Sequence, residues 1–289
     1  MRDLSLLTWS EVRDIDKTKS IVFVVLAPVE EHGKHLPLAT DVIEGEYWCK
    51  CAMRKLEQEL GTECFFLPSF PVASASVNEF YGSIHFSMKT TYEVTFAVLE
   101  SICCMGFRNI AVIASHADPQ HQIAVEKAVR KINKRNGLCV IAPMGQIFMG
   151  VSAERTPRLE EFEKEHGNDY HAGWIETSSM LDIDPCYVRD CYRDMPDSEI
   201  TDKDMIFRKR QIAAMGEYGY IGAPKYASEE LGKDLNDNCI ASICDAVGKF
   251  YRRDGYKKYE HYPLYNILPL HIGFLSIAGK VRRKKVAGQ

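Results

Sequence analysis

Four short apolar runs, separated by segments with a helical pattern, constrain the fold of this chain more than any other feature. The runs are residues 21–29, 63–72, 109–115 and 138–144, and helix-length segments at 43–60, 88–105 and 119–135 lie between them. The first run, IVFVVLAPV, is continuous and rich in β-branched residues, which is typical of a strand buried on both faces. Strands joined by helix-length crossovers predict an α/β fold with a mostly parallel sheet and helices on both faces.

The second half of the chain departs from this alternation. Residues 150–172 are polar and irregular, which fits a solvated loop or short helix, or else a flap over a functional site. Residues 173–182 have a helical pattern. Residues 226–252 predict a long helix that begins after Ser228, whose hydroxyl is a suitable N-cap.

No internal repeat or low-complexity linker divides the sequence, so we expect one domain over residues 1–255. Residues 256–289 form a C-terminal extension, in which the apolar run ILPLHIGFLSIAG precedes the basic tail KVRRKK. A membrane-surface patch is one interpretation of this pattern. Because the run is short and contains proline, we expect instead an arm that contacts a neighbouring subunit in an oligomer.

Charge and cysteine content narrow the class of protein. With 36 Lys and Arg against 40 Asp and Glu, the net charge of −4 gives no general attraction to nucleic acid. No apolar stretch reaches the ~20 residues that span a bilayer, so we expect no membrane partner. The N-terminus lacks the apolar core of a signal peptide. The ten cysteines lie in apolar or helical runs, which predicts free thiols and a cytoplasmic location.

Polar residues with the character of metal ligands follow the first strand. Glu30 and His32 are two positions apart, so that in an extended chain both side chains point to one face. Asp41 lies at the expected start of the next helix. Two carboxylates and an imidazole form a set that zinc, manganese or iron accepts. The carboxyl ends of parallel strands are also where open α/β sheets build their sites.

The third strand ends in a second set of the same kind. His116 and Asp118 are again two positions apart at the carboxyl end of a strand. Each set alone is more often an ordinary polar loop, but two such strand ends can converge on one centre. A carboxylate shared between them would bridge two ions.

A third segment carries an imidazole and a carboxylate around a helix start. It reads His171-Ala172-Gly173-Trp174-Ile175-Glu176-Thr177-Ser178. His171 and Glu176 are candidates for the same site, and Gly173 leaves room for the backbone to approach a substrate. The alternative is that the hydroxyls only satisfy local backbone groups and that Glu176 faces solvent.

These segments resemble the creatininase (creatinine amidohydrolase) family. Residues 28–41 are similar to its E-x-H-G-x-H-L-P motif followed by T-D, and residues 171–178 to its H-A-G-x-x-E-T-S motif. Weaker similarities follow at residues 80–84, which resemble F-P-G-T-I, and at residues 222–232, which resemble G-D-P-x-x-A-S-x-E-x-G. The resemblance covers about residues 5–250. It implies an α/β/α sandwich that acts as a metal-dependent hydrolase.

The resemblance also implies roles for individual residues. Glu30, His32, Asp41 and His116 match metal ligands, with Asp41 as the bridging carboxylate. Either Glu176 or Asp118 would complete the second ion. His171 matches the acid–base group, and Glu176 is the other catalytic candidate. Substrate contacts are expected from His35, Ser115, Tyr81 and Trp174. The implied cofactor is a pair of divalent ions, zinc before manganese or iron, and the implied assembly is a homo-oligomeric trimer of dimers.

The sequence departs from the family around the second histidine. The usual N-G-H-G-G-N is replaced by residues 114–119, Ala-Ser-His-Ala-Asp-Pro, which alters the backbone expected to touch substrate. We therefore expect a binuclear hydrolase that attacks a carbonyl of a small cyclic amide or related C–N bond, although creatinine itself is not favoured. Two alternatives are a C–C bond hydrolase acting on a cyclic polyol diketone and a non-catalytic metal-binding protein that retains the fold.

Overall fold

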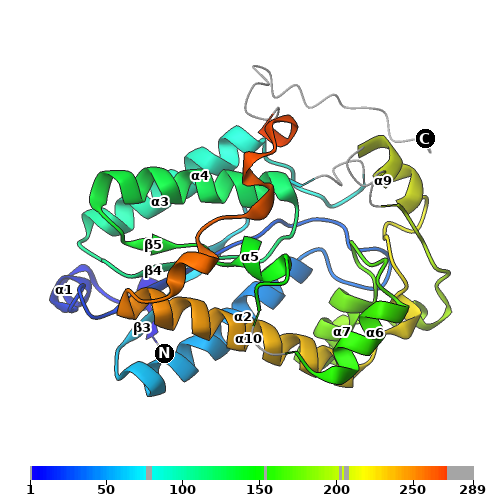
Figure 1. Ribbon diagram of the computed structural model, residues 1–289, viewed down its shortest axis with the longest axis horizontal. Coiled ribbons are helices and arrows are strands. Elements are labelled where there is room, and N and C mark those ends of the chain that lie inside the picture. Colours follow the sequence, from blue (N-terminus) through cyan, green and yellow to red (C-terminus); the bar gives the residue numbers. More distant parts are fainter. Residues whose placement is uncertain (1, 76–79, 153–154, 202–203, 205–207, 272–289) are drawn as a thin grey trace.

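A central sheet of five parallel strands organises the chain. The computed structural model describes residues 2–75, 80–152, 155–201, 204 and 208–271. The strands are β1 (Arg2–Asp3), β2 (Ile21–Leu26), β3 (Cys64–Phe70), β4 (Ile110–Ala114) and β5 (Val140–Ile141). They pair in the order β1-β3-β2-β4-β5, and every pair is parallel (Figure 1). The predicted parallel sheet is thus confirmed.

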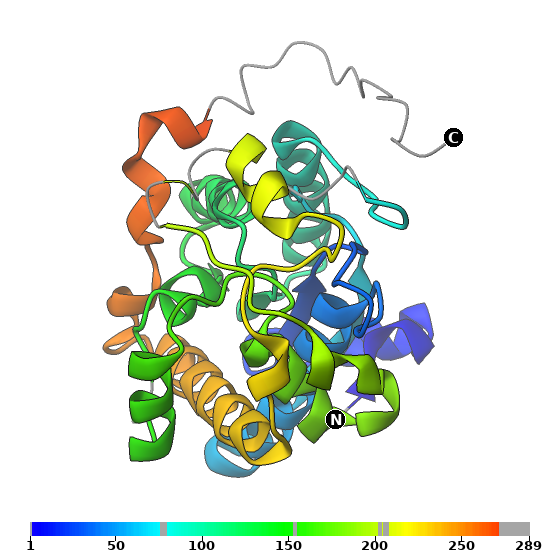
Figure 2. The same ribbon diagram turned by 90° about the vertical axis from the view of Figure 1, so that its right-hand side faces the viewer.

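Helices cover both faces of this sheet. The α-helices are α1 (Trp9–Asp14), α2 (Thr40–Leu60), α3 (Met88–Cys104), α4 (Pro119–Asn136), α5 (Met144–Phe148), α6 (Pro157–Glu165), α7 (Trp174–Ile183), α9 (Arg208–Met215) and α10 (Glu229–Arg252). Short 3-10 helices span Leu4–Leu6, Pro185–Tyr187, Asp190–Asp194, Pro224–Tyr226, Tyr256–Tyr259, Pro263–Asn266 and Leu268–His271. Helices α3 and α4 lie on one face, and α2 and α10 on the other (Figures 1 and 2). The three-layer α/β/α sandwich is confirmed.

Strand β2 is the centre of the fold because it is apolar throughout. All six of its residues are buried, and it pairs with β3 on one side and β4 on the other. Its last residue, Leu26, lies opposite Ala114, the last residue of β4. The chain segments that follow β2 and β4 therefore leave the sheet side by side at one edge.

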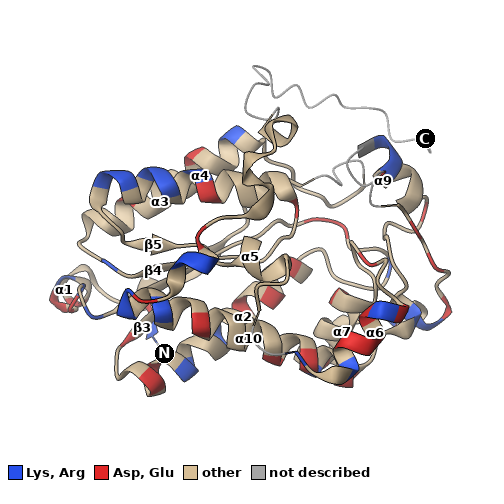
Figure 3. Cartoon of the chain, viewed as in Figure 1, with Lys and Arg blue, Asp and Glu red and all other residues tan. Residues whose placement is uncertain are grey.

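Helix α4 is an amphipathic crossover helix, with one face toward the sheet and one face toward solvent. Its inner face carries Ile123, Ala124 and Ile132, all buried, and its outer face is basic (Figure 3). The outer basic residues are Lys127, Arg130, Lys131, Lys134 and Arg135, which line a surface groove with Tyr92. An apolar face packed inward and a charged face in water are the features of an amphipathic helix at the surface.

Two short elements were not expected from the sequence, and one open alternative is decided by the structure. Elements β1 and α1 are two and six residues long, too short for a hydrophobic period to reveal them. Helix α6 forms within the polar segment because Thr156 caps it, accepting a hydrogen bond from the Leu159 N–H. Its Arg158 side chain binds Asp234 on α10, so the short-helix alternative holds for this segment. Ser228 caps α10, as predicted.

The described part of the C-terminal extension packs against the chain's own α4. The Tyr262 N–H donates to the buried carboxylate of Glu126 at 2.7 Å, and the Tyr262 ring packs with Ile123 and Ala124. The end of the apolar run and the basic tail, residues 272–289, lie outside the described residues. A subunit contact by this arm therefore stays a prediction. Among the described helices, none is both long and apolar enough to cross a membrane.

All ten cysteines are free thiols in the structure. Cys103 and Cys139 approach each other in the core, where their Sγ atoms lie 3.5 Å apart. We expect thiol titration of the denatured protein, without reductant, to find ten thiols per chain. A stoichiometric deficit would contradict the predicted reducing, cytoplasmic setting.

Candidate metal centre

Six side chains from three parts of the chain converge at the edge where β2 and β4 end. Glu30 and His32 follow β2, Asp41 lies in the first turn of α2, His116 follows β4, and His171 and Glu176 flank the start of α7. They form three overlapping groups able to hold a metal ion: Glu30–His32–His171, Glu30–Asp41–His116 and His32–Asp41–Glu176. The convergence of the first two strand ends is what the sequence predicted.

The hydrogen bonding of His32 directs one ring nitrogen at the centre. Its Nδ1 lies 3.1 Å from the carbonyl oxygen of Glu30, and because a carbonyl only accepts, Nδ1 carries the proton. In the neutral ring, Nε2 then presents its lone pair to the centre. This atom lies 3.6 Å from Asp41 Oδ2 and 3.8 Å from Glu176 Oε2. This is the arrangement of a histidine ligand whose tautomer is fixed by a second hydrogen bond.

His116 approaches the same aspartate from the end of the neighbouring strand, β4. Its Nδ1 lies 3.5 Å from Asp41 Oδ2 and 3.4 Å from Glu30 Oε1. The Oδ2 atom of Asp41 is thus next to a ring nitrogen of both His32 and His116. The main-chain carbonyl of Asp41 accepts from the Ser115 hydroxyl at 2.7 Å, which ties the start of α2 to the end of β4.

The centre contains buried polar atoms that the protein itself leaves without partners. Both carboxylate oxygens of Glu30, Oδ2 of Asp41 and Nε2 of His32 have no hydrogen-bond partner among the described residues. Such groups are costly to bury unless something binds them. Oxygen and imidazole donors that converge in this way suit zinc, manganese or iron, so the residues present fit a metal ion.

Crowding of acids and imidazoles shifts the proton affinities of the centre. Burial raises the pKa of Glu30 to about 7, although His116 opposes this shift. Burial alone would lower the pKa of His116, but the carboxylates of Glu30 and Asp41 raise it to about 10. Burial would raise the pKa of Asp41, but His116 and His32 hold it below its usual value. The ionised forms of these carboxylates are therefore stabilised by neighbouring positive charge.

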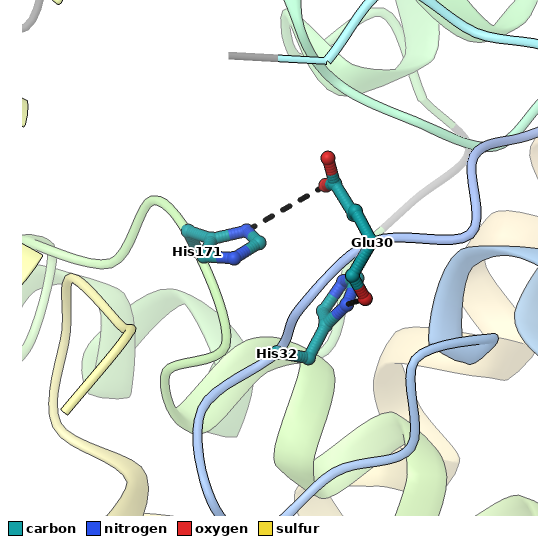
Figure 4. A group of neighbouring side chains, drawn as sticks. All are labelled: Glu30, His32 and His171. Carbon is teal, nitrogen blue, oxygen red and sulfur yellow. Dashed lines mark hydrogen bonds and ion pairs between the residues drawn. The ribbon is translucent and has the colours of Figure 1, made fainter. Parts of the chain in front are cut away.

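His171 faces the centre with one nitrogen and Glu31 with the other. Its Nδ1 lies 3.9 Å from Glu30 Oε1, and its ring is 4.7 Å from that of His32 (Figure 4). Burial would lower the pKa of His171, but its hydrogen bond to Glu31 and the charge of Glu30 raise it to about 10. His171 is thus placed either to exchange protons inside the centre or to bind a metal ion through Nδ1.

Local backbone geometry places His171 and Glu176 together. Ala172 adopts a left-handed conformation, with φ of 48°, which is unusual for a residue with a side chain. Its N–H donates to Glu176 Oε2 at 2.5 Å. A Cβ atom on Gly173 would meet Asp169 Oδ2 at 2.0 Å, so the space beside this glycine holds the Asp169 carboxylate and not a substrate. That carboxylate accepts from the Trp174 N–H and so fixes the start of α7.

Asp118 is placed differently from the other predicted ligands. Among the described residues, none of the three ligand groups includes Asp118. Its Oδ1 accepts from the backbone N–H groups of Gln120 and His121, at 2.7 and 3.3 Å, and caps α4. The first N–H groups of a helix lack partners within the helix, so a carboxylate at this position stabilises it.

We therefore expect Asp118→Ala to lower the free energy of unfolding by ~1 kcal/mol and to leave metal content unchanged. Asp118→Asn should restore most of the stability, because asparagine also caps helices. Metal analysis and thermal denaturation of the same preparations check this. Loss of metal in both variants would instead make Asp118 a ligand.

The four residues expected to bind substrate occupy different environments. His35 is buried, and its Nε2 pairs with the Thr177 hydroxyl at 2.9 Å; burial lowers its pKa to about 4. Trp174 is buried with Leu159, and its Nε1 donates to the His166 carbonyl. Like Ser115, His35 and Trp174 contact neighbouring segments and so stabilise the elements that carry the centre. Tyr81, at 73% exposure, is the one of the four that is open to solvent.

Three acidic residues near the centre were missed by the sequence analysis. Glu31 contacts His171, and Asp169 fixes the start of α7. Glu44 lies buried one turn beyond Asp41, and burial together with the Glu176 carboxylate raises its pKa well above the usual value. Helical periodicity from Asp41 could have revealed Glu44. No sequence signal marked Asp169.

Comparison with known proteins identifies the architecture. The family model described as "Creatininase: Creatinine amidohydrolase" matches residues 5–247. Among solved structures, a mutant creatininase of the Zn–Zn type is 18% identical, with a TM-score of 0.66 and coverage of 86% of this chain and 97% of its own. A structure described as "Creatininase Mn" is 19% identical, with a TM-score of 0.64 and coverages of 86% and 98%.

A further solved structure has the same fold. A putative creatinine amidohydrolase from Bacteroides fragilis is 20% identical, with a TM-score of 0.66, and the match covers 88% of this chain and 98% of that one. No curated protein matches the chain.

Proposed function

Since this chain belongs to the creatininase family of metal-dependent hydrolases, we propose that it holds two divalent ions and hydrolyses a C–N bond of a small cyclic amide. The single observation that carries the binuclear proposal is the position of Asp41. Its Oδ2 lies within 3.6 Å of His32 Nε2 and 3.5 Å of His116 Nδ1, and it belongs to two of the three ligand groups. One carboxylate between two sets of donors is the arrangement that a two-metal site needs.

In this proposal the two ions have different sets of ligands. Glu30, Asp41 and His116 hold the first, and all three are buried. His32, Asp41 and Glu176 hold the second, which is nearer to solvent because the Glu176 side chain is 23% exposed. Glu176, and not Asp118, is thus our choice for the second ion. When bound, the ions supply a polarised substrate carbonyl and a water activated near neutral pH.

The chain's own contribution to catalysis centres on His171. With Nε2 hydrogen bonded to Glu31, its Nδ1 faces the centre and can carry a proton to a leaving amine. Protonation of the leaving group by a positioned side chain typically accelerates such a step by ~10²–10⁴-fold. The His171 side chain is only 12% exposed and lies against Glu30 and His32, which limits the access of bulk water to that proton.

Three proposals about the whole molecule accompany this function. We propose zinc as the first choice of metal, a trimer of dimers as the assembly, and a division at residue 255 between the hydrolase domain and the C-terminal extension. The proposed assembly and metal follow from the resemblance to the family. Light scattering coupled to gel filtration and metal analysis test them directly.

The function is tested by metal analysis together with a substrate screen. Purified wild-type protein should contain two transition-metal ions per chain and should hydrolyse at least one of a panel of cyclic amides. Turnover confined to cyclic polyol diketones would replace the C–N proposal with C–C bond hydrolysis. Less than one tightly bound ion per chain would favour a non-catalytic binding protein and contradict both.

A further inference from the structure

In the sequence, Glu31 lies between the candidate ligands Glu30 and His32. Its main-chain carbonyl and its carboxylate, however, contact His171. The Nε2 atom of His171 lies 2.9 Å from the carbonyl oxygen of Glu31 and 3.2 Å from its carboxylate Oε1. Because a carbonyl oxygen only accepts, Nε2 carries a proton and donates it to both oxygens of this one residue. Glu31 itself belongs to none of the three ligand groups found among the described residues.

The Glu31 side chain is held in place from several directions. Its Oε2 accepts from the Gly33 N–H at 3.1 Å, and its main-chain N–H donates to the Ser83 hydroxyl at 3.0 Å. Gly219, with φ of 76°, packs against it so closely that a Cβ atom there would meet Oε2 at 2.3 Å. A buried carboxylate fixed in this way is a rigid acceptor.

This contact decides what His171 presents to the centre. An imidazole ring can turn over and can exchange its proton between the two nitrogens. With Nε2 bound to Glu31, the ring is fixed so that Nδ1 lies toward Glu30 and the metal ligands (Figure 4). A carboxylate that orients a catalytic or ligating histidine is a recurring device in enzymes.

We propose that Glu31 is the positioning residue of His171: its main-chain carbonyl and its carboxylate together hold the proton on Nε2, and the carboxylate fixes the ring orientation on which the role of His171 depends. The kinetic part of this inference rests on the proposed function. The geometric part does not, because the contact can be measured in protein that turns over no substrate.

The kinetic test compares Glu31→Ala, Glu31→Gln and a matched control, Glu46→Ala. Glu46→Ala makes the same chemical change at a glutamate that pairs with Lys50 and belongs to none of the ligand groups among the described residues. We expect Glu31→Ala to lower kcat by ~10–100-fold, with KM and metal content little changed. Glu31→Gln keeps one acceptor oxygen and should recover part of that loss. Glu46→Ala should behave as wild type.

A double-mutant cycle separates positioning from general damage to the site. If Glu31 acts only through His171, adding Glu31→Ala to His171→Ala should produce no further loss of kcat. If the two substitutions instead lower kcat independently, so that their fold-losses multiply in the double variant, the proposal is overturned. If His171→Ala does not change turnover, the acid–base role in the proposed function fails, and the inference about Glu31 is decided by spectroscopy alone.

The spectroscopic test follows the His171 ring itself by ¹⁵N NMR of histidine-labelled, zinc-loaded protein, with its signals assigned by their loss in His171→Ala. In wild type and Glu46→Ala we expect Nε2 to carry a proton that exchanges slowly with solvent. In Glu31→Ala the main-chain carbonyl still accepts from Nε2 but the carboxylate is gone, so we expect this proton to exchange faster with water. A His171 spectrum unchanged by Glu31→Ala, in a variant whose melting temperature shows that it folds, would overturn the proposal.

Discussion

Replacing Asp41 with alanine is expected to remove most of the bound metal and nearly all activity. The physical reason is that one carboxylate oxygen serves both sets of donors, those around His116 and those around His32. Removing it leaves each ion with two of its three protein ligands. Metal analysis of the purified variant, beside its rate on the substrate found in the screen, measures both effects.

A matched control for this variant lies on the same helix. Glu46, five residues after Asp41, pairs with Lys50 at 2.6 Å and lies outside the centre, so Glu46→Ala should keep its metal. Unfolding of Asp41→Ala is not expected, because the substitution removes a buried carboxylate oxygen that has no partner among the described residues. If Asp41→Ala retains two ions per chain, the assignment of Asp41 as the carboxylate shared by both ions is contradicted.

Replacing His171 with alanine is expected to keep both ions and the fold while activity falls by ~10²–10⁴-fold. The reason is that the proposed ligand sets do not need His171, whereas the leaving group needs its proton. A substrate whose leaving group requires no protonation should recover much of the loss. Metal content, melting temperature and rate are to be measured on one preparation.

The alternatives for His171 predict other results. If it is a ligand, as its place beside Glu30 and His32 allows, metal is lost with activity. If it only stabilises the start of α7, stability falls by ~1 kcal/mol and turnover hardly changes. His261, exposed at 62% on the C-terminal extension, provides a control whose replacement by alanine should change neither metal content nor rate.

The parallel sheet and most of the candidate centre were predictable because their signals are local. The buried runs that became β2 and β4 are continuous, and the acidic and histidine residues after them stand where parallel strands end. Family resemblance added the segment from His171 to Glu176. Spacing along the chain could not have placed it beside Glu30, more than a hundred residues away.

The contacts that the sequence analysis did not foresee depend on backbone geometry. It gave no role to Glu31, but residues 27–32 are not a strand, and the Glu31 carboxylate reaches His171. Asp118 was a candidate ligand because it follows His116 by two positions, but the N–H groups at the start of α4 bind its Oδ1, which is why we propose Glu176 for the second ion instead. Such outcomes depend on which backbone donors lie nearby.

Anomalous diffraction from crystals of the zinc-loaded protein, recorded at the zinc absorption edge, tests the central claim most directly. The account predicts two peaks per chain, one beside Glu30 and His116 and one beside His32 and Glu176, with the Asp41 carboxylate between them. A single peak, or two peaks of which neither contacts Asp41, would contradict it.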